Sequence, residues 1–331
     1  MPMSVVRRRL LAGLIGLAAL TALAVIPSPV AAEEPAKLPV VASFSILGDF
    51  VARIGGERVA VTTLVGPGGD AHVFEPTPAD AKALQGARVV VVNGLGFEGW
   101  AARLVKASGT KASVVVASTG VTARAAAEDD HDDHGKGKHA DHDHGKAKHG
   151  GHDHGAVDPH AWQSVANALV YVTTIRDGLI AADPVGRETY LGNAARYAEE
   201  LTALEAEVRA AVASVPPGRR RVITSHDAFG YFSDAYGIQF LAPRGISTDA
   251  EPTAKAVAGL IRQIRAEKIT AVFVETMTDG RLVERIAKET GVRVGGELYA
   301  DALSPKGGPA PTYVDMVRHN VKLLTAAMIG S

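Results

Sequence analysis

Short runs of β-branched residues alternate with helical patterns along most of this chain, and this alternation limits the fold more than any other feature. One series of runs lies between residues 38 and 118, and a second lies between residues 220 and 296. The run RVVVVN at 88–93 is typical of a strand buried on both faces of its sheet. The pattern predicts an α/β fold with two lobes, each built on a small parallel sheet flanked by helices.

A long helical pattern separates the two series. It covers residues 183–215 and stops at Pro216 and Pro217. We therefore expect an N-terminal lobe at 38–181, a rigid linking helix at 183–215 and a C-terminal lobe at 218–331. Ligands of parallel sheets bind beyond the carboxyl ends of the strands. With two lobes, the cleft between them is the expected binding site.

The first 32 residues have the features of a secretory signal peptide. Arg7, Arg8 and Arg9 precede an apolar stretch, and the small residues Val30 and Ala32 favour cleavage after Ala32. A permanent membrane anchor is the less favoured alternative, because the apolar run is barely long enough to span a bilayer. The chain has no cysteine, so it offers no thiolate metal ligand and no site for a lipid anchor. We expect a periplasmic protein, with release into the medium as the second possibility.

Histidine is the second strong feature of the sequence. Many of the 12 histidines lie in the stretch HDDHGKGKHADHDHGKAKHGGHDHG at 131–155. Because glycine and charged residues dominate there, we expect a disordered loop at 126–156. Its histidines could gather around zinc without enforcing one geometry, so the loop is interpreted as an accessory for zinc capture or transfer. The alternative is a solvated insertion without function. These histidines are His131, His134, His139, His142, His144, His149, His152 and His154.

The other histidines are candidates for a defined site. His72, His160 and His226 each lie where a strand or loop gives way to a helix, whereas His319 lies within the pattern of the final helix. Three imidazoles and one oxygen make a sound zinc shell. We expect the first three to share a site in the cleft and His319 to be structural.

Spacing alone leaves the oxygen ligand open. Asp301, in LYAD, and Glu275, in FVET, both lie at the ends of strands in the second series. Metal-bound histidines usually donate their second ring nitrogen to a carboxylate or a carbonyl group. Acidic residues near the three histidines are candidates to accept that hydrogen bond, and they are Asp70, Glu75, Asp158 and Asp227.

Four motifs make the chain similar to a known family. GGDAHVFEPTPAD, DPHAW, SHDAFGYF and LYAD occur in this order, with the histidine-rich stretch between the first and the second. Together they resemble the ZnuA-like solute-binding proteins of bacterial zinc and manganese ABC importers, over nearly all of the mature chain. The resemblance implies two lobes joined by a rigid helix, with the metal between them. It also implies a set of residues, namely the ligands His72, His160, His226 and Asp301, with Glu275 and Glu75 as candidates to support them.

The resemblance also implies a function and partners. We expect a protein that is not an enzyme, binds Zn²⁺ in the periplasm and delivers it to a membrane ABC permease with a cytoplasmic ATPase. A periplasmic zinc metallochaperone is a further candidate partner, and the protein is expected to be a monomer. The formal net charge of −1 argues against a nucleic-acid partner.

Other functions stay open from the sequence. Manganese members of the family often have Glu in place of His226, and three imidazoles favour zinc, but Asp301 keeps Mn²⁺ as the second candidate. A zinc-dependent hydrolase would use three histidines and an exchangeable fourth position. A metal buffer or adhesin without a transporter is a third class. Since free histidine titrates near ~6.5, the site is expected to lose affinity on acidification through about pH 6 to 5.

Overall fold

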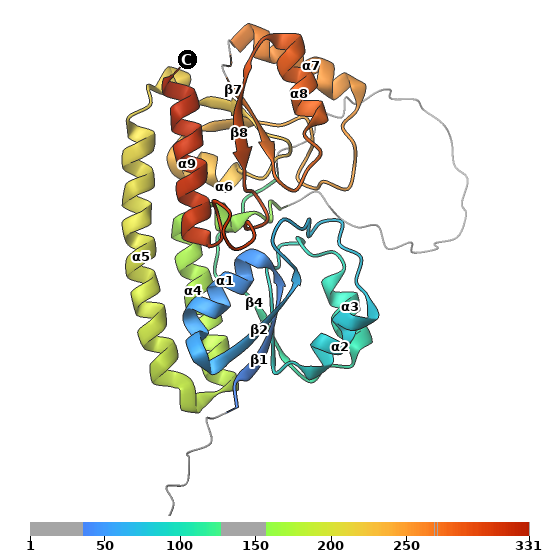
Figure 1. Cartoon of the computed structure of the whole chain (residues 1–331), viewed down its shortest axis with the longest axis vertical. Coiled ribbons are helices and arrows are strands. Elements are labelled where there is room, and N and C mark those ends of the chain that lie inside the picture. Colours follow the sequence, from blue (N-terminus) through green and yellow to red (C-terminus); the bar gives the residue numbers. More distant parts are fainter. Residues whose placement is uncertain (1–35, 127–156, 268, 270, 331) are drawn as a thin grey trace, which may run out of the picture. The chain divides into compact units, whose positions relative to one another are not determined.

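Two four-stranded parallel sheets form the frame of the chain (Figure 1). The structure is a computed structural model that describes residues 36–126, 157–267, 269 and 271–330. The expected signal peptide at 1–32 and the histidine-rich stretch at 131–155 lie outside these residues. The chain divides into Met1–Pro35 and Ala36–Ser331, and the description below concerns the second unit.

The first sheet consists of β1 (Leu38–Phe44), β2 (Val59–Val65), β3 (Val89–Val92) and β4 (Ser113–Val116). The strand order is β2-β1-β3-β4, and all pairings are parallel. These strands confirm the first predicted series. Val89, Val90 and Val91 are buried, as expected for a central strand covered on both faces.

Helices lie on both faces of this sheet, and they are α1 (Ser45–Gly55), α2 (Pro78–Gly86) and α3 (Ala101–Ser108). The sequence TPADAKALQGA predicts a helix with Thr77 as its N-cap, and α2 begins there, with a capping box between Thr77 and Asp80. The pattern FEGWAARLVKA at 97–107 predicts another helix, but α3 begins only at Ala101. The reason is that Glu98 folds back to accept hydrogen bonds from the backbone nitrogens of Asn93 and Gly94, at 2.6 and 3.2 Å. This segment is therefore a loop.

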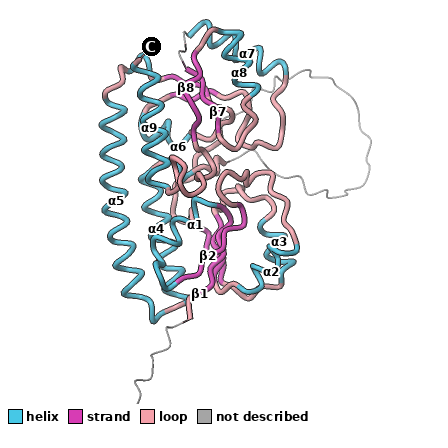
Figure 2. The backbone as a smooth tube through the Cα atoms, in the orientation of Figure 1, coloured by secondary structure: helices cyan, strands magenta, loops and turns pink. Residues whose placement is uncertain are grey.

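The second sheet consists of β5 (Arg221–Ile223), β6 (Gln239–Leu241), β7 (Ala271–Glu275) and β8 (Arg293–Leu298). Its helices are α6 (Gly230–Tyr236), α7 (Ala254–Glu267), α8 (Arg281–Thr290) and α9 (Tyr313–Ile329). The strand order β6-β5-β7-β8 repeats the topology of the first sheet, again with parallel pairings. Figure 2 shows strands of both sheets in magenta and the helices around them in cyan. The two-lobed α/β fold is thereby confirmed.

Two further helices lie between the sheets in sequence, α4 (Val165–Ala182) and α5 (Arg187–Ala213). The helical pattern of residues 161–181 predicts a helix from about Ala161, but Ala161–Gln163 is a single 3-10 turn and Ser164 is extended. The long helix was expected from residue 183, yet Pro184–Gly186 forms another 3-10 turn, with the Asp183 side chain accepting from the Gly186 nitrogen. Both differences are local breaks at the start of a correctly placed helix.

α5 is 27 residues long and connects the two lobes (Figure 1). It packs against α1 and α4 of the first lobe and against α6 and α9 of the second. One stripe of its surface is buried, and it comprises Tyr190, Ala194, Tyr197, Leu201, Leu204, Val208 and Val212. Because one hydrophobic cluster runs from the first sheet through this stripe to Phe229 and Phe273, the lobes share a continuous core.

α4 is, within the described residues, a helix long and apolar enough to cross a membrane by length and composition. It packs against α1, α5, β3 and β4. Tyr171, Val172, Ile175 and Leu179 are buried, so one face of this helix packs against the rest of the protein.

Candidate metal centre

Four side chains that are far apart in the sequence come together in one cluster. One ligand atom from each of His72, His160, His226 and Asp301 lies within 4.8 Å of the others. His72 lies on the loop after β2, His160 precedes the 3-10 turn before α4, His226 follows β5 and Asp301 follows β8. The structure therefore brings together the four residues that the resemblance indicated, two from each lobe.

Nitrogen and oxygen atoms in this cluster face one another at short distances. Nε2 of His72 lies 3.3 Å from Nε2 of His160 and 3.2 Å from Oδ2 of Asp301. Asp301 Oδ2 also lies 3.1 Å from His226 Nε2, and its Oδ1 lies 3.6 Å from His160 Nε2. In the described part of the chain, neither Asp301 oxygen nor His226 Nε2 makes a hydrogen bond. Buried polar atoms without partners are rare, and their convergence on one point suits a cation.

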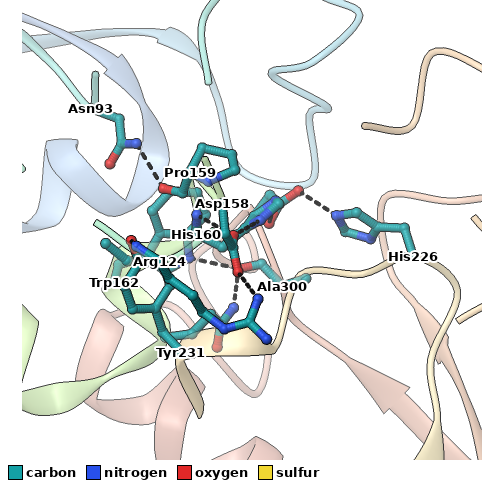
Figure 3. Close-up of polar contacts among 12 residues, drawn as sticks. Asn93, Arg124, Asp158, Pro159, His160, Trp162, His226, Tyr231 and Ala300 are labelled. Atoms are coloured by element: carbon teal, nitrogen blue, oxygen red, sulfur yellow. Dashed lines mark hydrogen bonds and ion pairs between the residues drawn. The ribbon is translucent and has the colours of Figure 1, made fainter. Parts of the chain in front are cut away.

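His160 is oriented by the buried carboxylate of Asp158 (Figure 3). Asp158 Oδ1 accepts from the His160 backbone nitrogen at 3.0 Å and lies 2.9 Å from Nδ1 of the ring. Because a carboxylate can only accept, Nδ1 carries a hydrogen, and Nε2 is the ring nitrogen that faces the cluster and would bind a metal. Asp158 was one of the acidic residues noted near the histidines in the sequence.

His226 has a matching partner in Glu275, the last residue of β7. Glu275 Oε2 makes a short hydrogen bond with Nδ1 of His226. The other oxygen accepts from the backbone nitrogens of Ser225 and His226 at 2.9 and 3.0 Å. Glu275 is fully buried and is not among the clustered ligand atoms. Spacing left Glu275 and Asp301 open as the oxygen ligand. In the structure Asp301 belongs to the cluster, whereas Glu275 contacts the Nδ1 atom of His226 on the side of the ring away from it.

Replacing Glu275 with glutamine should weaken metal binding by roughly 10- to 100-fold, the usual effect of losing a carboxylate behind a metal-bound histidine. The amide keeps the size of the side chain but loses the charge that favours the hydrogen on Nδ1. Glu284→Gln, on the exposed face of α8, is the matched control and should bind as the wild type does. Metal affinity is measured by competition with a chelator. Equal affinities in the two variants would show that Glu275 does not support the site.

His72 is held through its backbone instead. Asp70 Oδ1 accepts from the His72 nitrogen at 2.9 Å, and Asp70 Oδ2 accepts from Thr248 Oγ1 of the second lobe at 2.6 Å. Glu75, a candidate support from the sequence, is exposed, and among the described residues it makes no hydrogen bond or ion pair with the cluster. Asp70, which was also among the acidic residues noted in the sequence, contacts the backbone of His72.

The backbone around Asp301 is fixed by the first lobe. The carbonyl oxygen of Ala300 accepts from Trp162 Nε1 at 2.9 Å and from Gln163 Nε2 at 2.8 Å. The Leu303 nitrogen donates to Ser45 Oγ at 2.9 Å. Sequence reasoning missed these groups. The motif DPHAW holds the one available signal, since Trp162 follows His160 by two positions.

Two aromatic rings line the cluster. The Phe97 ring packs edge-on against His72 with the ring centroids 4.7 Å apart, and the Trp162 ring lies 5.3 Å from that of His160. Both rings are buried. Such walls exclude water and strengthen the electrostatic interactions inside the cluster.

The cluster is electrostatically coupled. Burial opposes charge on His160, but nearby carboxylates, Asp301 foremost, outweigh it and raise its pKa to about 9. Burial likewise opposes charge on His226, and Glu275 and Asp301 raise its pKa well above the ordinary value. Burial lowers the pKa of His72. Burial would also raise the pKa of Asp301, but the two charged histidines hold it well below its usual range.

His319 lies apart from the cluster, as expected. Its Nε2 lies 3.0 Å from the carbonyl oxygen of Glu297, and its ring packs edge-on against Tyr299. These contacts attach α9 to the end of β8.

Known proteins are similar to this chain over most of its length. A family model described as zinc-uptake complex component A, periplasmic (ZnuA), matches residues 40–327. The manganese-binding lipoprotein MntA of Halalkalibacterium halodurans is 34% identical over 296 residues, covering 89% of this chain and 90% of MntA. The iron-binding protein YfeA of Yersinia pestis is 32% identical over 285 residues, covering 86% of this chain and 84% of YfeA. The solved structure of the periplasmic zinc-binding protein TroA of Treponema pallidum has a TM-score of 0.76 at 28% identity, covering 88% of this chain and 99% of TroA.

Proposed function

This chain belongs to the ZnuA family of periplasmic zinc-uptake components, and from that premise we propose that its cargo is Zn²⁺. Membership makes it the metal-binding, substrate-binding component of an ABC importer, whose partners are a membrane permease and an ATPase. The family is not enzymatic, which excludes the zinc-dependent hydrolase considered from the sequence.

The observation that carries the zinc proposal is the convergence of three imidazole Nε2 atoms and one carboxylate. Zinc binds histidine nitrogen at about 2.0–2.1 Å, so the ligands of a tetrahedral site lie about 3.3–3.4 Å apart. The separations of 3.1–3.6 Å between the Asp301 oxygens and the histidines, and of 3.3 Å between His72 and His160, are close to that value, and the four ligand atoms all lie within 4.8 Å of one another. These separations support a four-ligand site of about zinc size.

Manganese is the second candidate, because MntA is named for manganese and YfeA for iron. Asp301 would suit such harder ions, and a bidentate carboxylate would add a fifth donor atom. Three imidazoles favour zinc, which also binds more tightly than Mn²⁺ or Fe²⁺ to a given nitrogen and oxygen site. We therefore propose zinc as the cargo, because the ligands are three imidazoles and one carboxylate.

We propose that the protein captures Zn²⁺ in the periplasm, carries it to the permease and releases it there. The continuous core along α5 and the hydrogen bonds between the lobes support a modest opening of the cleft during release. We propose that the mature protein is an unanchored monomer in the periplasm, although MntA is named a lipoprotein, since the sequence has no cysteine to carry a lipid. Zinc would reach the cleft from solution, from the histidine-rich stretch or from a periplasmic metallochaperone.

Deleting residues 129–154 should leave one tight zinc site per chain. All four proposed ligands lie outside this segment, and the structure describes all four of them as one cluster. A competition titration of the full-length and deleted proteins should show the weaker additional sites only in the full-length protein. Adding His160→Ala to the deletion is the control, and it should lower the zinc affinity of the remaining site. Loss of tight binding on deletion alone would contradict the proposal, because the principal ligands would then lie in the histidine-rich stretch.

A further inference from the structure

Arg124 lies outside the metal cluster but touches the residue that orients one of its ligands. Arg124 Nη1 lies 3.2 Å from Asp158 Oδ2, the oxygen that His160 does not use (Figure 3). Asp158 is fully buried. A buried carboxylate is stable only when its oxygens have partners, and a charged partner is the most effective one. Arg124 therefore holds one oxygen of Asp158 while the other faces the His160 ring.

The same guanidinium group also reaches the second lobe. Arg124 Nε donates to Asp234 Oδ2 on α6 at 3.0 Å, and the Arg124 backbone nitrogen donates to the Tyr231 hydroxyl oxygen at 2.9 Å. α6 directly follows the loop that carries His226. Arg124 thus connects Asp158, behind a ligand of the first lobe, to the helix that follows a ligand of the second lobe.

A glycine makes this contact possible. A Cβ atom on Gly230, the first residue of α6, would lie 2.3 Å from Arg124 Nη1 and 2.4 Å from Asp158 Oδ2. Only a residue without a side chain allows α6 to come this close to the ion pair. The backbones of Arg124 and Asp158 are also paired, since the Asp158 nitrogen donates to the Arg124 carbonyl oxygen at 2.8 Å. Asp158, Asp234 and Tyr231 together fix the position of Arg124.

We propose that Arg124 is a positioning residue that holds the Asp158–His160 pair in its metal-binding orientation while α6 is docked against the first lobe. When α6 moves away, the arginine loses Asp234 and Tyr231, and its hold on Asp158 weakens. The carboxylate can then turn from the His160 ring, and His160 loosens its bond to the metal. Lobe contact and metal retention are coupled through this one side chain. The inference rests on the proposed function only in requiring a metal in the cleft, whichever metal that is.

The test is the rate of metal release from the mature full-length protein into excess chelator. Release from the cleft is followed by tryptophan fluorescence, because the Trp162 ring lies next to His160. Arg124→Met, which keeps the unbranched apolar part of the side chain but not its charge, should release zinc roughly 10- to 100-fold faster. Gly230→Ala should act in the same direction, since it displaces the arginine without removing any charge. Arg124→Lys should restore part of the retention, because an ammonium group can pair with one carboxylate but lacks the planar fork that holds two.

The matched control is Gly259→Ala on α7, where an added Cβ would meet nothing closer than 3.8 Å. It should release zinc as the wild type does. The melting temperature of each metal-free variant separates a loss of folding from a loss of retention. Release from Arg124→Met and Gly230→Ala within about two-fold of wild type would overturn the inference, even if both variants melt earlier. Release as fast from Arg124→Lys as from Arg124→Met would also overturn it. A wild type that holds no zinc contradicts the zinc proposal instead, and the same variants are then compared with Mn²⁺.

Discussion

Replacing His160 with alanine is expected to weaken zinc binding in the cleft by roughly 100- to 1,000-fold. Zinc sites of this kind are worth on the order of 10–16 kcal/mol in total, so each of four ligands contributes about 2.5–4 kcal/mol. His226→Ala should have a similar effect, because both rings are fully buried and direct Nε2 to the same point. Competition with a chromophoric chelator, on protein lacking residues 129–154, measures the change without interference from the histidine-rich stretch.

His319→Ala is the matched control for both variants. It removes the same ring from a helix outside the cluster, so zinc affinity should stay within about two-fold of wild type. Some stability should be lost with the contacts to Glu297 and Tyr299, and thermal unfolding of the metal-free protein would show it. An affinity loss in His319→Ala as large as that in His160→Ala would mean that the wrong histidines have been assigned.

Zinc affinity should also fall steeply as the pH decreases, beginning well above neutrality. In the metal-free protein the pKa of His160 is raised to about 9, and that of His226 is raised well above its ordinary value. Both rings therefore carry a proton at pH 7 that zinc must displace. Asp301 is already ionised, and burial keeps His72 neutral. Each displaced proton adds a tenfold loss of affinity per pH unit, so the two together predict roughly 100-fold per unit below their pKa values.

Calorimetry in buffers of different ionisation enthalpy measures the number of protons released. At pH 7 we expect nearly two protons per zinc ion, again on protein lacking residues 129–154. The count should fall by about one in His160→Ala, although the affinity is also lower. A count near zero, or an affinity that stays constant between pH 8 and 6, would show that the two histidines are neutral before metal binds or do not bind it.

The alternation of strands and helices along the chain could be predicted from the sequence, because local pattern determines it. A buried strand such as 88–93 needs apolar residues on both faces, and Thr77–Pro78 is typical of the start of a helix. The resemblance to the family also indicated four metal ligands, and the structure brings these four residues together. His72 and Asp301 are more than 200 positions apart, yet both follow strands at the carboxyl ends of the two sheets.

The groups that support the cluster could not be predicted in the same way. Glu75 is close to His72 in sequence but exposed to solvent, whereas Asp70 accepts a hydrogen bond from the His72 backbone nitrogen. Trp162 and Gln163 fix Asp301 through the carbonyl oxygen of Ala300, a contact that depends on how the two lobes dock. Such contacts follow from tertiary packing, for which neither spacing nor propensity carries a signal.

The expected pH range also changed once the fold was known. Histidines with ordinary pKa values predict a loss of affinity through about pH 6 to 5. The carboxylates packed around His160 and His226 move that loss to higher pH, because they stabilise the charged rings in the metal-free protein. The sequence contains all of these acidic residues but not their distances from the rings.

The central claim is that this chain supplies zinc to the cell, and cellular metal content tests it most directly. Affinity in solution is less decisive, because zinc outcompetes manganese at most sites rich in nitrogen ligands. The measurement is mass spectrometry of zinc and manganese in cells grown in metal-poor medium, with the gene intact, deleted, or replaced by the His160→Ala variant. We predict that zinc falls in the deletion and variant cells, that manganese is unchanged, and that the wild-type gene restores zinc. A fall in manganese with constant zinc would contradict the account.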